Sequence, residues 1–313
     1  MNRHGMTIAG AAIALMLTGC GKGADQAENG AAAQSGAATT DAGDPAAGAK
    51  LSAYTAGYNK LLDTFGLPAM VEAYAKEEIA RKSPTDSISV NTGWLEQAMT
   101  LLKTARAMPG GPADVDQAAD RLIGALGTAM TRLEGLKVYY DSKAYKEDGL
   151  KRGKLEDPAM TAEFKAATTA MEQFSNILDR EQKVAGTAAL AALKASGDML
   201  GYHTKLALQQ TDQLVSMFKG EGDITNAAVI AKADAQVAQI EQTLATQRAE
   251  LATAKAAATA DKPVDVDYGL VGDQLTSVVG DYRDMKQSRD TDDFNDMVEH
   301  YNSAIEDAND IDG

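Results

Sequence analysis

The chain has 313 residues and is poor in cysteine and in the residues that favour β-strands. Its one cysteine, Cys20, has no partner for a disulfide, so the folded part must be stable without one. Aromatic residues make up only 5%, valine and isoleucine are sparse, and alanine supplies much of the 44% hydrophobic content. Alanine is the best helix former, and no segment shows a sustained period-two alternation. The composition therefore predicts an all-α protein.

Positive charge is also scarce, with 30 lysines and arginines against 45 aspartates and glutamates. The formal net charge of −15 argues against nucleic acid as a partner, because binding phosphate requires clustered lysine and arginine. It argues equally against adsorption of the chain to anionic lipid by charge. The simplest role for the excess acid is solubility.

The first twenty residues have the pattern of a bacterial lipoprotein export signal. Arg3 gives a short positive segment, and the apolar run from Met6 to Leu17 is too short to span a bilayer as a helix. The run ends in a Leu-Thr-Gly-Cys motif at Cys20 that resembles a lipobox. We therefore predict a signal peptide over residues 1–19 and lipidation of Cys20. The alternative is an ordinary secretory signal in which the cysteine is accidental.

The lipobox predicts attachment to a membrane through a lipid anchor at Cys20. The next residue is Gly21, not an aspartate that would favour the inner membrane, so we expect the outer membrane of a Gram-negative cell, facing the periplasm. Residues 21–48 have no large apolar side chain and cannot bury enough surface to offset the entropy of ordering. Residues 20–48 are thus predicted to form a lipidated, disordered tether that reaches roughly 30 Å on average.

Apolar residues at helical spacing begin at Leu51 and predict an elongated helical bundle over residues 49–313, with about seven to nine helices. We predict one long helix from Asp114 to about Lys146 and a second after Pro158. A later stripe predicts unbroken helix through Lys219. The most regular seven-residue repeat, over residues 230–258, is typical of a helix that packs along a seam. Two sub-bundles divided near residues 149–158 are an alternative to one domain.

Chemical variety concentrates in the middle of the chain, where tyrosines and charges of both signs interrupt the alanine-rich pattern. The residues that stand out there and at the two ends of the folded part are Tyr140, Lys143, Tyr145, Lys146, Asp148, Gly153, Lys154 and Phe164, with Tyr58-Asn59, Phe294-Asn295 and Tyr301-Asn302. This pattern resembles the YiiG-like bacterial lipoproteins, an uncharacterised domain family. Glu156 departs from the family pattern, which has a Leu-His pair after the Gly-Lys. The resemblance covers most of residues 49–310 and implies a helical envelope lipoprotein, with no activity and no site residues.

The central stretch has two interpretations. In the first it is a helix end, where Tyr140 and Tyr145 anchor the last turn in the core, lysines complement the helix dipole and Gly149 permits the turn. In the second it is a surface for a ligand or partner, with tyrosine rings as contacts and basic groups that attract an anion. The candidate ligand-binding residues are Tyr140, Lys143, Tyr145, Lys146, Lys151, Arg152 and Lys154.

Residues for catalysis or metal binding are few. Beyond the signal the chain has two histidines, His203 and His300, and it has no Gly-x-Ser-x-Gly element. Acidic runs over residues 265–267 and 290–293 lack the spacing of an EF-hand, and helix capping accounts for the second of them. Paired Glu-x-x-His motifs of di-iron bundles are absent from the sequence. We predict a protein that is not an enzyme and has no cofactor and no metal site.

Together these observations predict a lipid-anchored periplasmic helical protein whose role is to bind another envelope component or to contribute structure. The expected partners are the membrane, through Cys20, and an envelope protein or the cell wall. The alternative is a module that binds a small anionic ligand or a metal ion.

Overall fold

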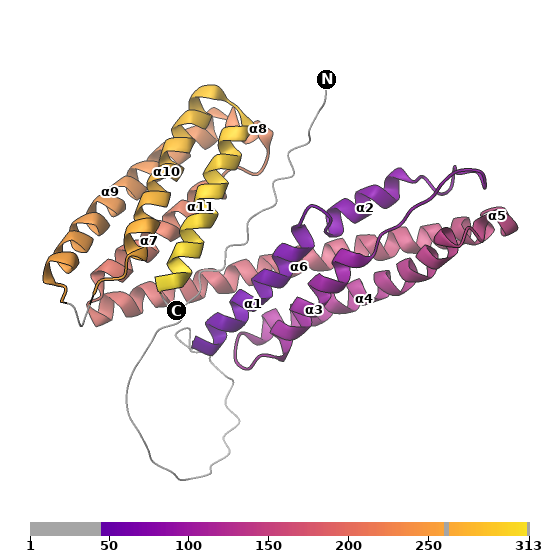
Figure 1. The fold of residues 1–313 in the computed structure, drawn as a ribbon, viewed down its shortest axis with the longest axis horizontal. Coiled ribbons are helices and arrows are strands. Elements are labelled where there is room, and N and C mark those ends of the chain that lie inside the picture. Colours follow the sequence, from indigo (N-terminus) through magenta and orange to yellow (C-terminus); the bar gives the residue numbers. More distant parts are fainter. Residues whose placement is uncertain (1–44, 260–262, 312–313) are drawn as a thin grey trace, which may run out of the picture. The chain divides into compact units, whose positions relative to one another are not determined.

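The computed structural model describes residues 45–259 and 263–311, and in these ranges it contains helices and no extended strand (Figure 1). This confirms the all-α prediction. Nine of the described helices have ten residues or more, in agreement with the predicted number, and two more are single turns. The signal peptide, Cys20 and the predicted tether up to residue 44 lie outside the described residues. Residues 45–48 are helical, so the folded part starts four residues before the predicted residue 49.

The helices follow one another with short connections. The helices of ten residues or more are α1 (Pro45–Leu62), α2 (Leu67–Lys76), α3 (Gly93–Ala107), α4 (Ala113–Asp141), α6 (Lys151–Ser196), α7 (Met199–Val215), α9 (Ala227–Ala257), α10 (Asp267–Ser288) and α11 (Thr291–Ile311). The single turns are α5 (Tyr145–Asp148) and α8 (Glu221–Ile224).

The helices form two compact units, each with its own core. The N-terminal unit consists of residues 46–183, and the C-terminal unit consists chiefly of residues 184–313. The division falls inside α6, not near residues 149–158 where proline and glycine cluster. Residues 149 and 150 belong to a turn within the N-terminal unit, and residues 151–158 are the first turns of α6. A break in local helix propensity and a break in packing are therefore at different places in this chain.

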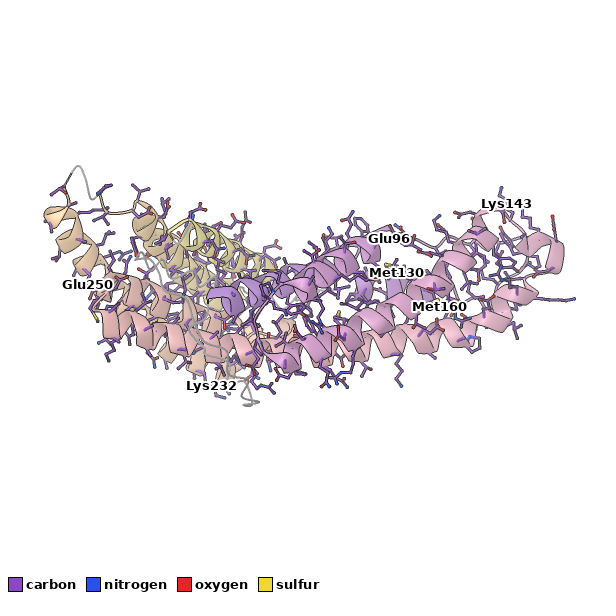
Figure 2. The ribbon with its side chains drawn as sticks, turned by 90° about the horizontal axis from the view of Figure 1, so that it is seen from below. Glu96, Met130, Lys143, Met160, Lys232 and Glu250 are labelled. Atoms are coloured by element: carbon purple, nitrogen blue, oxygen red, sulfur yellow. The ribbon has the colours of Figure 1, made fainter. Side chains whose placement is uncertain are left out.

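The core of the N-terminal unit lies between α1, α3, α4 and α6 (Figure 2). Leu95, Leu122 and Phe174 are fully buried, and Tyr54 meets Phe174 edge-on with ring centroids 5.6 Å apart. Burying such side chains stabilises the folded state by roughly 1.5–3 kcal/mol each. Gly57 allows α1 to approach α3, because a Cβ there would lie only 2.8 Å from Leu102 Cδ2.

One end of the N-terminal unit is fixed by polar contacts with α6. Gln182 Nε2 donates to the Thr55 hydroxyl over 2.7 Å, and Arg180 pairs with Asp114 at the start of α4. The start of α4 and the middle of α1 therefore lie beside the last residues of α6 in this unit. The turn between α4 and α6 lies at the opposite end, roughly 45 Å away at 1.5 Å per residue.

The C-terminal unit packs α7, α9, α10 and α11 around a second core (Figure 1). The seven-residue repeat predicted over residues 230–258 lies on α9, and the face it defines is buried. Its buried members are Ile230, Ala233, Val237, Ile240, Leu244, Gln247 and Leu251.

Three helix boundaries differ from the predictions. The predicted unbroken helix through Lys219 is wrong. Helix α6 ends at Ser196, where Gly197 takes a φ of +81°, and Asp198 starts α7 by accepting a hydrogen bond from Gly201 N. The second long helix begins at Lys151, and Pro158 lies inside it on an exposed face. The first long helix ends at Asp141, five residues before the predicted end.

Candidate functional site

The stretch singled out in the sequence forms a tight turn at the free end of the N-terminal unit. We call residues 142–155 the lysine turn; they run from the end of α4 through α5 to the first turn of α6. Three residues have left-handed backbone, with φ of +60° at Lys143, +69° at Gly149 and +65° at Leu150. Glycine adopts this conformation freely, whereas Leu150 does so at a steric cost that its complete burial offsets.

Three tyrosines fill the inside of the lysine turn. Tyr139, Tyr140 and Tyr145 are 4%, 2% and 3% exposed, and their ring centroids lie 5.1–6.3 Å apart. Tilted and edge-on contacts at these distances are favourable between aromatic rings. Tyr140 and Tyr145 therefore hold the turn to the end of the bundle, as the structural interpretation expects.

Tyr139 ties α4 to the start of α6. Its hydroxyl donates to Asp148 Oδ1 over 2.7 Å, and Arg152 N donates to Asp148 Oδ2 over 3.0 Å, so Asp148 caps α6. Burial and the contact with Asp148 raise the pKa of Tyr139 to about 12. The same hydrogen bond lowers the pKa of Asp148. Both changes favour the hydrogen-bonded forms present at neutral pH.

Arg152 is occupied by contacts within the protein. Its guanidinium lies over the Tyr139 ring, 5.3 Å from the centroid, and its Nε donates to Glu156 over 2.7 Å. Glu156 also pairs with Arg132, which bonds Glu163 on the next turns of α6. The arginine therefore belongs to a charged network along the side of α4 and α6.

Gly153 lies under the tyrosine cluster. A Cβ at this position would be 2.8 Å from the Tyr140 hydroxyl and 3.1 Å from Leu150 Cδ1. The Tyr140 hydroxyl is buried and has no hydrogen-bond partner among the residues the structure describes. Gly153, part of the sequence pattern, thus has a packing role.

Four lysines stand on the outside of the lysine turn. Lys143, Lys146, Lys151 and Lys154 are exposed, and within the described ranges none pairs with a carboxylate. Lys143 lies at the extreme end of the N-terminal unit (Figure 2). Four neighbouring ammonium groups without internal partners can attract an anion, but they offer no nucleophile and no general base.

The seven candidate residues therefore separate into three groups. Tyr140 and Tyr145 are buried, Arg152 is engaged in a network, and the four lysines are exposed on the turn. Sequence reasoning gave no role to the two residues that set the geometry, Tyr139 and Asp148, although Asp148 belongs to the sequence pattern. The sequence holds one signal for Asp148, which is an aspartate just before a helix start, but nothing in the sequence connects it to Tyr139.

Both histidines of the folded part pair with carboxylates across helices of the C-terminal unit. His203 Nδ1 lies 2.8 Å from Glu250 Oε2, which joins α7 to α9. His300 Nδ1 lies 2.7 Å from Asp281 Oδ2, which joins α11 to α10. In the part of the chain with described side chains, neither ring contacts a serine or threonine hydroxyl. The arrangement joins helices and does not resemble a catalytic triad.

Acidic residues in the C-terminal unit act at helix ends. Asp290 Oδ1 accepts from Asp292 N at the start of α11 over 3.1 Å, which agrees with the predicted capping role. Asp265 Oδ1 accepts from Asp267 N at the start of α10, also over 3.1 Å. Over residues 45–259 and 263–311, no three His, Cys, Asp or Glu side chains are grouped as a metal site. None of the helices in these ranges has the length and apolar content needed to cross a bilayer.

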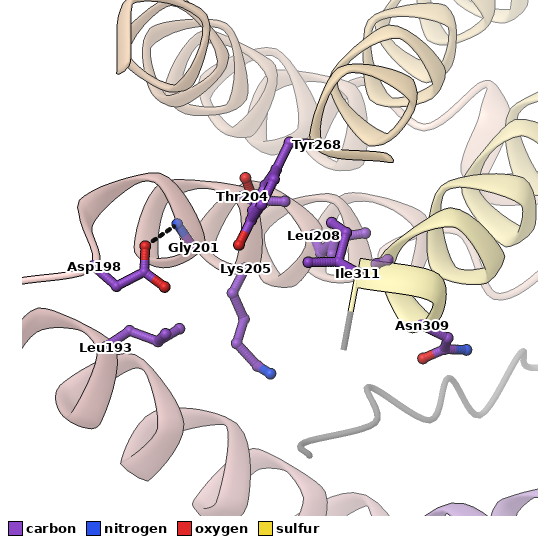
Figure 3. Close-up of a pocket in the computed structure, with 10 residues that line it drawn as sticks. Leu193, Asp198, Gly201, Thr204, Lys205, Leu208, Tyr268, Asn309 and Ile311 are labelled. Atoms are coloured by element: carbon purple, nitrogen blue, oxygen red, sulfur yellow. Dashed lines mark hydrogen bonds between the residues drawn. The ribbon is translucent and has the colours of Figure 1, made fainter. Parts of the chain in front are cut away.

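One pocket of about 70 Å³ lies in the C-terminal unit, between the last residues of α6, the first turns of α7, the start of α10 and the end of α11 (Figure 3). Lys205, only 9% exposed, extends into it from α7, and Tyr268 closes another side. The Asp198 carboxylate is held at its edge by the hydrogen bond from Gly201 N. The pocket combines an ammonium, a carboxylate and a phenol with apolar walls.

The fold and these sites place the protein among all-α proteins built from helical bundles, with a basic turn at one free end. The chain belongs to a family described as protein of unknown function (DUF3829), which it matches over residues 47–310. Comparison with curated proteins and with solved structures gave no match.

Proposed function

We propose that the protein is a YiiG-like, lipid-anchored periplasmic member of this family that binds another envelope component and has no enzymatic activity. The lysine turn supports this proposal. It presents four uncompensated lysines on a backbone that the buried tyrosines hold in place, so binding there would require little ordering of the chain. The lipobox at Cys20 and the Ala/Gly-rich segment after it support attachment to the outer membrane through a flexible tether.

Replacing Cys20 with Ala tests the anchor. We expect the wild-type chain in the membrane fraction and the Cys20→Ala chain in the soluble periplasmic fraction. A control with Thr18→Ser keeps the lipobox and should leave the fractionation unchanged. Retention of the Cys20→Ala chain in the membrane would contradict lipidation.

Cross-linking in intact envelopes tests the binding role. A photo-reactive residue placed at Lys146 should give adducts with an envelope component, and one at the exposed Lys232 of α9 serves as the control. Adducts specific to position 146 support the proposal. Equal yields at the two positions, or none at either, would contradict a binding surface at the lysine turn.

A second function is favoured by the pocket of the C-terminal unit, where the Lys205 ammonium lies beside apolar walls and suits a small ligand with an anionic group. A thermal-shift panel of small anions, amino acids and divalent cations tests it. A shift that Lys205→Met abolishes would support this alternative. The absence of any shift across the panel would remove it.

A further inference from the structure

We propose that the lysine turn docks on the headgroups of an anionic lipid bilayer, so that the N-terminal unit is held to the membrane at the end farthest from the tether. This inference rests on the proposed function, because it names the envelope component that the turn binds. Four features carry it: the division of charge between the units, the exposed face of α6, the shape of the turn, and its distance from the start of α1.

The net charge of −15 is not spread evenly over the chain. Residues 46–183 hold 18 lysines and arginines against 19 aspartates and glutamates, whereas residues 184–313 hold 10 against 22. Net charge therefore disfavours anionic lipid for the C-terminal unit and not for the N-terminal one. Charges farther apart than about 8 Å are largely screened at physiological salt, so the local charge of the turn decides its binding.

The local charge of the lysine turn is positive. Residues 143–154 contain five basic and two acidic side chains. Of the acidic pair, Asp148 is engaged by Tyr139 and the start of α6, and Glu147 is exposed. The one arginine is balanced by Glu156, which leaves the four lysines as the charges available to an outside anion.

The first turns of α6 add an apolar group to the lysines. Lys151, Lys154, Leu155 and Pro158 have i, i+3, i+4 and i+7 spacing, so they share one face of the helix, and all four are exposed. Leu155 is 81% exposed, the highest value among the large apolar side chains that the structure describes. Lysines beside a projecting leucine suit a lipid interface, where ammonium groups meet phosphates and the leucine enters the acyl boundary.

The shape of the turn favours a surface over a small ligand. Its inside is filled by Tyr139, Tyr140 and Tyr145, and the four lysines are exposed on its outside. A small soluble anion would contact only exposed lysines, and water competes with it for these ammonium groups. A bilayer offers many phosphates on an extended plane and can engage all four lysines together.

The position of the turn makes this a second attachment point. The start of α1, which follows the tether, and the lysine turn are at opposite ends of the N-terminal unit. An acyl anchor together with a polybasic patch binds a membrane more firmly than either alone, because the second contact becomes intramolecular. The C-terminal unit, with its 22 acids, is repelled by the same surface.

Vesicle flotation with the mature chain carrying Cys20→Ala tests lipid binding without the anchor. The probes are vesicles of phosphatidylcholine alone and of phosphatidylcholine with phosphatidylglycerol at a ratio of roughly 7:3, which gives the second set a negative surface potential. We expect binding to the anionic vesicles only, and we expect a rise in salt to reverse it. Excess soluble glycerol phosphate should not compete, because it lacks the plane of charges.

Matched variants locate the binding surface. Lys151→Gln with Lys154→Gln should weaken partitioning by about 25-fold, at roughly fivefold per lysine near an anionic surface. Lys103→Gln with Lys165→Gln removes the same charge from exposed positions elsewhere in the unit and should change binding little. Leu155→Gln should weaken binding further, whereas Leu270→Gln on α10 should not.

The outcomes separate this inference from the proposed function. No flotation with anionic vesicles, equal loss in the two lysine pairs, or full competition by glycerol phosphate would each overturn docking on lipid. If lipid binding fails while cross-linking from position 146 captures an envelope protein or cell-wall polymer, the proposed function stands and only this inference falls.

Discussion

Tyr139 and Tyr140 are neighbours in sequence and in space, yet losing the hydroxyl should have opposite effects at the two positions. The Tyr140 hydroxyl is buried without a described partner, and a buried unpaired hydroxyl costs roughly 1–3 kcal/mol. Tyr140→Phe keeps the ring and its aromatic contacts and removes that cost. We expect the free energy of unfolding of the N-terminal unit to rise by about 1–2 kcal/mol.

Tyr139→Phe is the matched control. It removes the 2.7 Å hydrogen bond to Asp148 and the tie between α4 and the start of α6. The expected loss is about 1.5 kcal/mol, at the lower end for hydrogen bonds to charged groups because Asp148 is partly open to water. The two substitutions delete the same atom type within one cluster, so differences in helix propensity cancel.

Urea unfolding followed by tryptophan fluorescence measures both effects. The chain has a single tryptophan, Trp94, and it belongs to the N-terminal unit, so the signal reports on that unit alone. The midpoints should move in opposite directions with an unchanged slope. A Tyr140→Phe protein that is less stable than wild type would show that the hydroxyl has a partner and would refute the reasoning.

Single positions in both units allow three further tests. Gly153→Ala should destabilise the N-terminal unit by about 1–2 kcal/mol, because the clash of a Cβ 2.8 Å from the Tyr140 hydroxyl outweighs the gain in helix propensity. Gly124→Ala, where a Cβ would have nothing within 4 Å, should stabilise the unit by up to about 1 kcal/mol. Equal effects of the two substitutions in urea unfolding would contradict this. Asp307→Asn should raise the stability of the C-terminal unit at pH 7 by up to about 1 kcal/mol, because burial, and then Asp310 and Glu306, raise the pKa of Asp307 and disfavour its charged form in the folded state. The gain should vanish below pH 3, where the side chain is neutral in both the wild type and the variant. Unfolding followed by circular dichroism at the two pH values checks it. The pKa of Tyr139 is about 12 in the folded state and about 10 in the unfolded state, so its contribution to stability is complete below pH 10 and is lost as pH rises through 12. The difference in tyrosinate absorbance between the wild type and Tyr139→Phe should therefore appear only above pH 10. A difference that titrates at pH 10 would contradict the buried placement of Tyr139.

The sequence predicted where the candidate site lies and what its tyrosines do, but not how its charged side chains are paired. The sequence marked the region around residues 140–154, placed tyrosines in a structural role and gathered the lysines, because a run of chemically varied residues between alanine-rich helices is visible locally. It did not separate Arg152 from the lysines, since that separation depends on Glu156, Tyr139 and the fold of the turn. The pairs His203–Glu250 and His300–Asp281 join residues 47 and 19 positions apart and leave no pattern in the chain.

Local physics by itself determined the helical class and the buried face of α9, because backbone propensity and side-chain periodicity act over one or a few turns. Only the tertiary structure decided where the units divide, and it placed that division inside an unbroken α6, away from the glycine and proline near residue 150. It also kept Pro158 within a helix and held Leu150 in left-handed backbone, two local costs that packing offsets. Burial and long-range pairing are properties of the assembled core, so only the core divides the lysine turn into a buried tyrosine side and an exposed lysine side.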